Sequence, residues 1–412
     1  MNKIAILTDF ISHDPAYSLC SVVFNQVKML SMNGYRPRVL VREGFDVEGS
    51  YLGKADGYIL NPGDIGQNTV SVTDRSEMEI ASLYGQMKSA LDGVSYVITH
   101  DMIYQPNQWK YHVAARRVAK ETDIQWIHFV HSATSMGTAG KTGMFRKELE
   151  GRFPNSRLAV FHNEEINRKG AAFGYEVDEI VVIPNAMDLT EHFHDVSADI
   201  CADMSSADVI AVYPCRLDRG KQPHILVEVF GELVKMGYDA RVVIVDFHST
   251  SGDKSTYRDE IVELADKLMV DVQFTSSYPE CEYHVPHKVV MDLFEYGDIL
   301  IHPSMSESDP LIIPEAMWKG CGMILNFDLP LFRQYDGKAL FYKFSSAIDV
   351  NTGEPGETAT NYANRAAYMA QVAAGIAYVM ENNPVLYNHA YVRKNRSLEA
   401  IWSKHLWPTI GS

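Results

Sequence analysis

The sequence predicts an α/β protein with two domains, each built on a parallel sheet. Short, nearly continuous apolar runs alternate with helical stretches, which is typical of parallel strands buried on both faces. This alternation extends from Ile4 to Ile183 and starts again at Val209. The chain has 412 residues, too many for one ordinary core, so two domains of about 150–200 residues are expected.

The predicted strands are short and rich in β-branched residues. In the first half they cover 4–7, 38–41, 96–99, 124–130, 158–161 and 180–183, and in the second half 209–213, 242–245, 272–274, 299–301 and 323–325. Helices are predicted between most of them, for example over 22–30 and 112–120. The result is two Rossmann-like domains, residues 1–190 and 191–384, joined near 187–208, where no clear apolar period is present. Two more helices, 361–380 and 385–405, end the chain.

Composition is that of an ordinary globular protein, with 46% hydrophobic and 22% charged residues. The first apolar run, Ile4–Leu7, is too short for a signal sequence or a membrane span, so we expect a soluble, cytoplasmic protein without integral membrane association. The five cysteines are scattered and form no CxxC pair. They are therefore predicted to be free thiols, with neither a disulfide framework nor a zinc site.

Charge is unevenly distributed along the chain. The net charge is −16, yet residues 1–185 contain 19 basic and 21 acidic residues, so most of the excess acid lies in the second half. Within the first half, the segment 103–120 has no acid and combines Arg116 and Arg117 with aromatic residues that include Trp109. This segment predicts a local basic face able to contact an acceptor substrate; an ordinary solvated helix face is the alternative.

Polar residues follow most of the predicted strands. They are Asp9, His100, Asp101, His131, His162, Asn163 and Asn185 in the first half, and Arg216, Asp246, His248, His302, Ser304, Asn326 and Asp328 in the second. In open α/β sheets, ligands bind outside the carboxyl ends of the strands. The sequence therefore predicts an active site in a cleft between the two domains.

Two segments of the second half carry the strongest chemical signal. YPCRLDRGKQP (213–223) offers Arg216 and Lys221 before a helix that is expected to start near Pro223. HPSMSESDPLIIPEAMWKGCG (302–322) offers Glu307 and Glu315, with seven residues between them. Cations and carboxylates next to helix N-termini can hold a diphosphate and the sugars attached to it.

These segments resemble the retaining glycosyltransferases of GT-B fold, family 4, which carry a GRLxxxKG-like loop and an E-x7-E motif followed by A-M-x-x-G. VVIPNAMD (181–188) is similar to the PNGVD turn that ends the first domain of that family, and HFVHSATS places His131 at the position of its active-site histidine. The resemblance implies two Rossmann-like domains facing each other across a cleft. The first would bind the acceptor and the second the nucleotide-sugar donor, while residues 385–412 would pack back on the first domain.

The same resemblance assigns roles to the donor residues. Arg216 and Lys221 would neutralise the diphosphate, and Glu307 would contact the transferred sugar. Glu315 would bind the ribose hydroxyls; its alternative role is that of a helix-dipole partner. For the two cations the alternative is a solvated basic loop.

Further donor contacts are expected from the loop around Glu307. Ser304 and Ser308 would add donors to the phosphates, and Asp309 would affect the phosphate contact or the choice of sugar. Ser308-Asp309-Pro310 stands where Gly-Phe-Gly is frequent in the family. His131 would contact the transferred sugar, with a purely structural strand-end histidine as the alternative. The catalytic set is thus His131, Glu307, Arg216 and Lys221; no metal and no cofactor are expected.

The acceptor is predicted less narrowly. His100 and Asp101 would bind the acceptor or act as its base, together with Trp109, Arg116 and Arg117. The opening of the chain and YPCRLDRGKQP also resemble phage-encoded members of the family, some of which glycosylate hydroxymethylated pyrimidines in DNA. The acceptor is accordingly a saccharide or small molecule, or phage DNA in the host cytoplasm. Two functions of other classes also suit the fold: a nucleotide-sugar epimerase and a non-catalytic nucleotide-sugar-binding protein.

Overall fold

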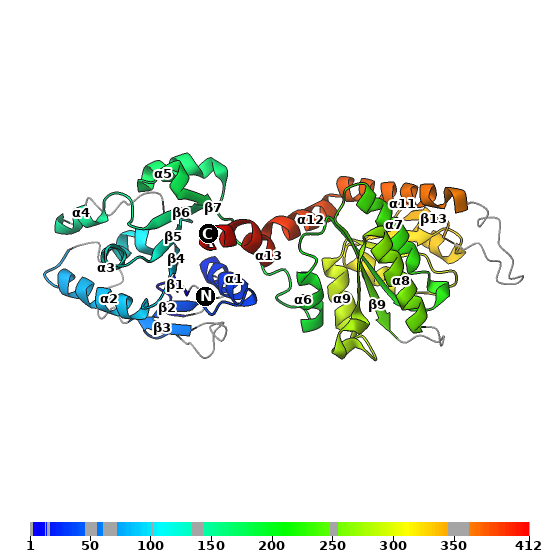
Figure 1. Cartoon of the computed structure of the whole chain (residues 1–412), viewed down its shortest axis with the longest axis horizontal. Helices are drawn as coiled ribbons and strands as arrows, with labels where there is room; N and C mark the ends of the chain where they lie inside the picture. Colours follow the sequence, from blue (N-terminus) through cyan, green and yellow to red (C-terminus); the bar gives the residue numbers. More distant parts are fainter. Residues whose placement is uncertain are drawn as a thin grey trace, which may run out of the picture. The chain divides into compact units, whose positions relative to one another are not determined.

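The computed structural model describes residues 3–12, 14, 17–45, 56–60, 72–100, 102–133, 143–247, 254–344 and 362–411. The chain divides into two compact units: unit 1 comprises Met1–Asp188 and Leu398–Ser412, and unit 2 comprises Leu189–Ser397. Both units are α/β, and each contains one parallel sheet (Figure 1). The predicted class of two Rossmann-like domains is therefore confirmed.

Unit 1 is built on a seven-stranded sheet with the order β3-β2-β1-β4-β5-β6-β7. Its strands are β1 (Ile4–Leu7), β2 (Arg38–Arg42), β3 (Asp56–Leu60), β4 (Tyr96–His100), β5 (Gln125–Phe129), β6 (Ser156–Val160) and β7 (Ile180–Val182). All pairs are parallel. The order reverses between β1 and β4, which makes their carboxyl ends the expected ligand position.

Alternate residues of these strands face two separate cores, as the period of a strand requires. Ala5 and Leu7 of β1 belong to one cluster, which contains buried residues of α2 and α3, whereas Ile4 and Ile6 belong to the other, which contains those of α1. Helices therefore cover both faces of the sheet. The helices of unit 1 are α1 (Ser18–Met32), α2 (Ser76–Ala90), α3 (Trp109–Glu121), α4 (Arg146–Leu149), α5 (Ile166–Phe173), α13 (Leu398–Ile401) and α14 (Trp407–Ile410).

Unit 2 has a six-stranded sheet with the order β10-β9-β8-β11-β12-β13. Its strands are β8 (Val209–Arg216), β9 (Ala240–Phe247), β10 (Asp271–Phe274), β11 (Ile299–His302), β12 (Gly322–Asn326) and β13 (Leu340–Tyr342). Again all pairs are parallel, and the order reverses between β8 and β11. Its helices are α6 (Asp195–Ala202), α7 (His224–Lys235), α8 (Lys254–Leu268), α9 (His287–Tyr296), α10 (Ile312–Trp318), α11 (Tyr362–Asn382) and α12 (Pro384–Arg396).

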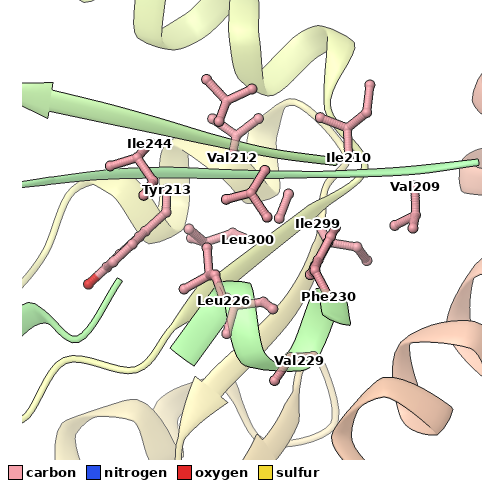
Figure 2. Close-up of a cluster of buried hydrophobic side chains, with 14 of the residues drawn as sticks. Val209, Ile210, Val212, Tyr213, Leu226, Val229, Phe230, Ile244, Ile299 and Leu300 are labelled. Atoms are coloured by element: carbon pink, nitrogen blue, oxygen red, sulfur yellow. The ribbon is translucent and has the colours of Figure 1, made fainter. Parts of the chain in front are cut away.

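The core of unit 2 is centred on β8 and its neighbours. Figure 2 shows Leu226 and Phe230 of α7 packed beneath strand residues that include Val212 and Ile299. The predicted start of this helix near Pro223 is confirmed, because Pro223 is the residue before its first turn. The five cysteines are buried free thiols, as predicted.

The chain returns to unit 1 at Leu398. Leu398 and Ile401 are buried in the same cluster as the apolar face of α1, and the Trp402 ring lies 5.7 Å from that of Tyr35. His405 donates from Nδ1 to the carbonyl of Val182 at 2.8 Å. The prediction of one helix over 385–405 is wrong: α12 ends at Arg396 within unit 2, and the returning segment consists of α13, a π-helical turn over Trp402–Leu406, and α14.

One further element of unit 2 differs from the prediction. The segment 187–208 contains α6, whose Val196, Ile200 and Cys201 are buried. Val196 and Ile200 lie on one face of a helix at i and i+4, but eight residues are too few to show a clear period in the sequence. α6 packs against α9 and extends the core of unit 2.

Candidate functional site

A pocket of about 140 Å³ lies at the carboxyl ends of β8 and β11 in unit 2. This is the point where the strand order reverses, and therefore the expected ligand position of a doubly wound sheet. β8 ends at Arg216 and β11 ends at His302. The pocket is lined by Tyr213, Pro214, Cys215, Arg216, Lys221, His302, Glu307, Pro310, Leu311 and Ile312.

Hydrogen bonds join the two segments that carry the strongest chemical signal in the sequence. Met305 donates from its backbone N–H to the carbonyl of Gly220 at 2.9 Å. Within the first segment, the Tyr213 hydroxyl donates to the carbonyl of Lys221, also at 2.9 Å. The loop after β8 and the loop after β11 are thereby held as one wall of the pocket.

Gln222 stabilises these loops through buried side-chain hydrogen bonds. It adopts the left-handed backbone conformation, with φ 55°, and only 2% of it is exposed. Its side-chain amide donates to the carbonyl of Pro303 at 2.7 Å and to that of Phe344 at 2.9 Å. The sequence gives no sign of this role, because both acceptors lie more than eighty residues away along the chain.

Replacing Gln222 by leucine is expected to destabilise unit 2 by about 1–3 kcal/mol, since two buried carbonyl groups lose their donor. Urea unfolding of the wild type and the variant measures this difference. Gln334→Leu is the matched control: its amide also donates to a backbone carbonyl, that of Leu331, but at an exposed position. Equal stability of Gln222→Leu and the control would contradict the assigned role.

Lys221 and Glu307 form an ion pair inside the pocket. Lys221 Nζ lies 2.5 Å from Glu307 Oε1, and the exposed fractions of the two side chains are 20% and 13%. The Arg216 side chain is 39% exposed, and its Nε lies 3.4 Å from Asp218 Oδ2. An anion that enters the pocket therefore meets two cations, one of which it must share with Glu307.

His302 lines the pocket next to this ion pair. It is 1% exposed, and its Nε2 lies 3.4 Å from Glu307 Oε1, without forming a hydrogen bond. Its ring lies 5.6 Å from that of Tyr213 and 5.2 Å from that of Phe332. Burial lowers the pKa of His302 to about 4, so the ring is neutral at pH 7. The sequence marked His302 only as a strand-end residue and assigned it no role in the site.

The other predicted donor residues lie near these loops but are not among the residues that line the pocket. Glu315, in α10, accepts a hydrogen bond from His287 Nε2 at 2.9 Å. Ser308 and Asp309 are exposed. Ser304 is fully buried, and its hydroxyl donates to the carbonyl of Ser306 at 3.1 Å. This hydroxyl is buried and engaged within its own loop, and a contact of Ser304 with a phosphate, through its hydroxyl or its backbone, stays a prediction.

In unit 1, two of the predicted histidines contact each other at the carboxyl ends of β4 and β5. His100 Nδ1 lies 3.0 Å from His131 Nε2, and His100 Nε2 lies 3.0 Å from Gln26 Oε1. His100 is 2% exposed; burial, and then the neighbouring His131, lower its pKa well below the ordinary value. His100 is therefore neutral. Asp101, predicted as its partner, lies outside the described residues.

Asp9 adds a carboxyl group just after β1. It accepts a hydrogen bond from Gln108 Nε2 at 2.7 Å, and burial raises its pKa. β1 and β4 are the strands at which the order of this sheet reverses. The polar strand-end residues of unit 1 thus occupy the same topological position as Arg216 and His302 do in unit 2.

The predicted basic and aromatic face on α3 does not form. Trp109 is 0% exposed and belongs to the core, and Arg116 is 6% exposed. The Arg116 guanidinium donates to three backbone carbonyls of the 150–152 segment. Arg117 forms ion pairs with Glu77 and Glu148. The segment 103–120 contains no acid of its own, but α2 and α4 supply acidic partners, which the sequence of α3 could not reveal.

The described residues show neither a metal cluster nor a helix suited to a bilayer. Among them, no three His, Cys, Asp or Glu side chains lie together in a way that could hold a metal ion. None of the helices described above is both long and apolar enough to span a membrane.

Comparison with known proteins gives a family match over part of the chain. Residues 204–326 match the family model of glycosyl transferases group 1. This segment runs from β8 to β12 and contains Arg216, Lys221, Glu307 and Glu315. No curated protein matches the chain.

Several solved structures resemble the chain at low identity. HepE of Anabaena, in complex with UDP and glucose, is 13% identical with 100% of both chains covered and a TM-score of 0.37. A glycosyltransferase of Rickettsia africae is 14% identical, with coverage of 98% of this chain and 97% of the other and a TM-score of 0.35. Sucrose-phosphate synthase of Thermosynechococcus elongatus is 14% identical, with coverage of 100% and 96% and a TM-score of 0.33. At these TM-scores the likenesses carry no argument about function.

Proposed function

We propose that this protein is a retaining glycosyltransferase of the family 4 type, which moves a sugar from a nucleotide-diphosphate donor to an acceptor hydroxyl. One observation carries the proposal: Arg216, Lys221 and Glu307 line a single pocket at the switch point of unit 2. They do so within the segment that matches glycosyl transferases group 1. Two cations beside one carboxylate suit a diphosphate that carries a sugar.

In the proposed reaction, the diphosphate is the leaving group. Negative charge grows on its terminal phosphate as the glycosidic bond breaks, and Arg216 and Lys221 stabilise that charge. Lys221 is held by Glu307 at 2.5 Å, so the phosphate and the carboxylate share its ammonium group. Glu307 retains a second oxygen that can accept a hydrogen bond from a hydroxyl of the transferred sugar.

Glu315 is proposed to bind the ribose of the donor. Its carboxylate is oriented by His287, which leaves acceptor capacity on both oxygens. The arrangement requires no metal ion, because the two cations neutralise the diphosphate. Transfer is therefore expected to continue at an unchanged rate in the presence of EDTA.

Unit 1 is proposed to bind the acceptor, with His100 and His131 near the reacting groups. A saccharide or another small hydroxyl compound is favoured over DNA as the acceptor. The DNA hypothesis depended on a basic and aromatic face on α3, and the structure buries Trp109 and Arg116 and pairs Arg117 with two glutamates. Retention of configuration is proposed through a front-face route, in which the departing diphosphate helps to deprotonate the acceptor hydroxyl.

Donor turnover without an acceptor tests the proposal. The wild type is expected to release nucleotide diphosphate slowly from its donor by hydrolysis, and Glu307→Gln is expected to lose this activity. Glu282→Gln, which changes an exposed glutamate of the same unit, is the control. NMR of the first product should show the anomeric configuration of the donor. Conversion of the donor to an epimer without release would instead identify an epimerase, and binding without turnover would identify a non-catalytic binding protein.

A further inference from the structure

Unit 1 contains a chain of three hydrogen-bonded side chains that the proposed reaction does not yet use. Gln26 is on α1, His100 ends β4, and His131 follows β5. Gln26 Oε1 lies 3.0 Å from His100 Nε2, and His100 Nδ1 lies 3.0 Å from His131 Nε2. The fold brings these residues together from three distant segments, at the switch point of the sheet.

With the Gln26 amide oriented as in the structure, these three side chains have one consistent arrangement of protons. Gln26 Oε1 can only accept, so Nε2 of His100 must carry a hydrogen. His100 is buried and neutral, so its ring has no second hydrogen and Nδ1 presents a lone pair. That lone pair can accept only if Nε2 of His131 is the donor. In the neutral form of His131, Nδ1 then carries the lone pair.

The aromatic surroundings fix the orientation of both rings. His100 stacks on Phe129, with ring centroids 5.1 Å apart and an interplanar angle of 27°. His131 packs against Phe161 with a centroid distance of 4.6 Å. Gln26 is 5% exposed, so water does not readily replace its oxygen as the acceptor. Of the described groups, His131 is the one whose charge acts on His100.

We infer that Gln26 and His100 are positioning residues that fix the tautomer of His131, so that its Nδ1 is the atom that receives a hydrogen bond, or a proton, from a substrate hydroxyl. This inference rests on the proposed function, in which His131 acts on the sugar or the acceptor. A proton taken up at Nδ1 gives an imidazolium whose Nε2–H still donates to His100. The hydrogen bonds among Gln26, His100 and His131 are therefore compatible with both charge states of His131. They exclude only the neutral tautomer that carries its proton on Nδ1.

The same sheet supplies a matched control. His128 lies in β5, one residue before Phe129, and is also fully buried. Its Nδ1 lies 2.8 Å from the hydroxyl of Thr99. It packs against Trp126 and Phe153, a buried aromatic environment apart from the Gln26–His100–His131 chain. Thr99→Val therefore removes the partner of a buried histidine without altering the chain that holds His131.

The test is the ¹⁵N NMR spectrum of histidine-labelled protein at neutral pH, with the His131 signals assigned from His131→Gln. The wild type and Thr99→Val are expected to show His131 protonated at Nε2, and Gln26→Leu is expected to show a mixture of the two tautomers. Gln26→Leu should also lower kcat by about tenfold, the effect of one lost hydrogen bond, with little change in the KM for the donor. Thr99→Val should lower stability but leave kcat unchanged.

The spectrum of the wild type can overturn the inference even if a variant fails to fold. A His131 signal that shows the proton on Nδ1 would overturn the inference, and so would an unchanged tautomer in Gln26→Leu. Because the spectrum needs no substrate, its outcome is independent of whether transfer is detected. Absence of transfer with a fixed tautomer would count against the proposed function and not against the tautomer inference.

Discussion

Lys221→Met is expected to lower kcat/KM for sugar transfer by about 10²–10³-fold, the usual cost of removing one group that stabilises charge in the transition state. Lys221 lines the pocket at the switch point of unit 2, and its Nζ lies 2.5 Å from Glu307. Without the ammonium group, the leaving diphosphate loses one of the two cations that line the pocket among the described residues, and the Glu307 carboxylate repels it. Steady-state kinetics with a saturating acceptor measures the effect.

Arg219→Met is the control for this prediction. Arg219 lies two residues from Lys221 in the same turn, but its side chain is 57% exposed and pairs with Glu260 at 2.8 Å. It is not one of the residues that line the pocket. Activity close to that of the wild type is therefore expected for Arg219→Met. Equal losses in the two variants would show that the turn, and not the Lys221 charge, accounts for the effect.

Arg393→Met is expected to destabilise unit 2 by about 3–5 kcal/mol, because it leaves a buried carboxylate without its counterion. Arg393 and Asp298 have exposed side-chain fractions of 2% and 0%, and Arg393 Nη2 lies 2.8 Å from Asp298 Oδ2. The guanidinium also donates to the carbonyls of Ala207 and Tyr296, which ties α12 to the segment before β8 and to the end of α9. Hydrogen exchange of the amides of Ile299–His302 measures the loss within unit 2.

The loss should depend on pH in a defined direction. Burial raises the pKa of Asp298, and removal of Arg393 would raise it further. A carboxyl group whose pKa is higher in the folded state lowers the free energy of unfolding as pH rises above its unfolded pKa of about 3.9. The deficit of Arg393→Met should therefore be greater at pH 7 than at pH 5.

Two companion variants separate the buried charge from other effects. Arg393→Met combined with Asp298→Asn should recover part of the stability, because no unpaired charge stays buried. Lys235→Met, which removes a pair with Glu232 from an exposed position, should cost less than about 1 kcal/mol. A loss in Arg393→Met no greater than in Lys235→Met would contradict the assigned role of the buried pair.

Strands at the centre of each sheet could be predicted because both of their faces are buried. The two strands that sequence patterns did not reveal, β3 (Asp56–Leu60) and β13 (Leu340–Tyr342), both lie at a sheet edge. An edge strand pairs on one side only, and the residues of β13 are only partly buried. The continuous apolar run by which strands were identified is therefore not required at an edge, although the other two edge strands, β7 and β10, were predicted.

For the site, residues in short sequence motifs could be predicted, whereas residues whose roles depend on partners distant in sequence could not. Arg216, Lys221 and Glu307 were predicted because each lies in a short local motif, and the structure brings them to one pocket. Gln26 and Gln222 were missed because their roles depend on partners more than seventy residues away. Local sequence was misleading at Trp109 and Arg116, whose surroundings come from other segments and bury both side chains.

The most direct test of the central claim is to incubate the pure protein with UDP-, GDP- and ADP-sugars and a mixed pool of saccharides, with hydroxymethylpyrimidine DNA in a parallel reaction. Release of nucleotide diphosphate and product mass are read together. The account predicts release with one of the donors and a saccharide that gains the mass of one sugar. A gain of mass by the DNA would support transferase activity but contradict the proposal that the acceptor is a saccharide. No release and no product with any donor would contradict the claim that unit 2 activates a nucleotide sugar.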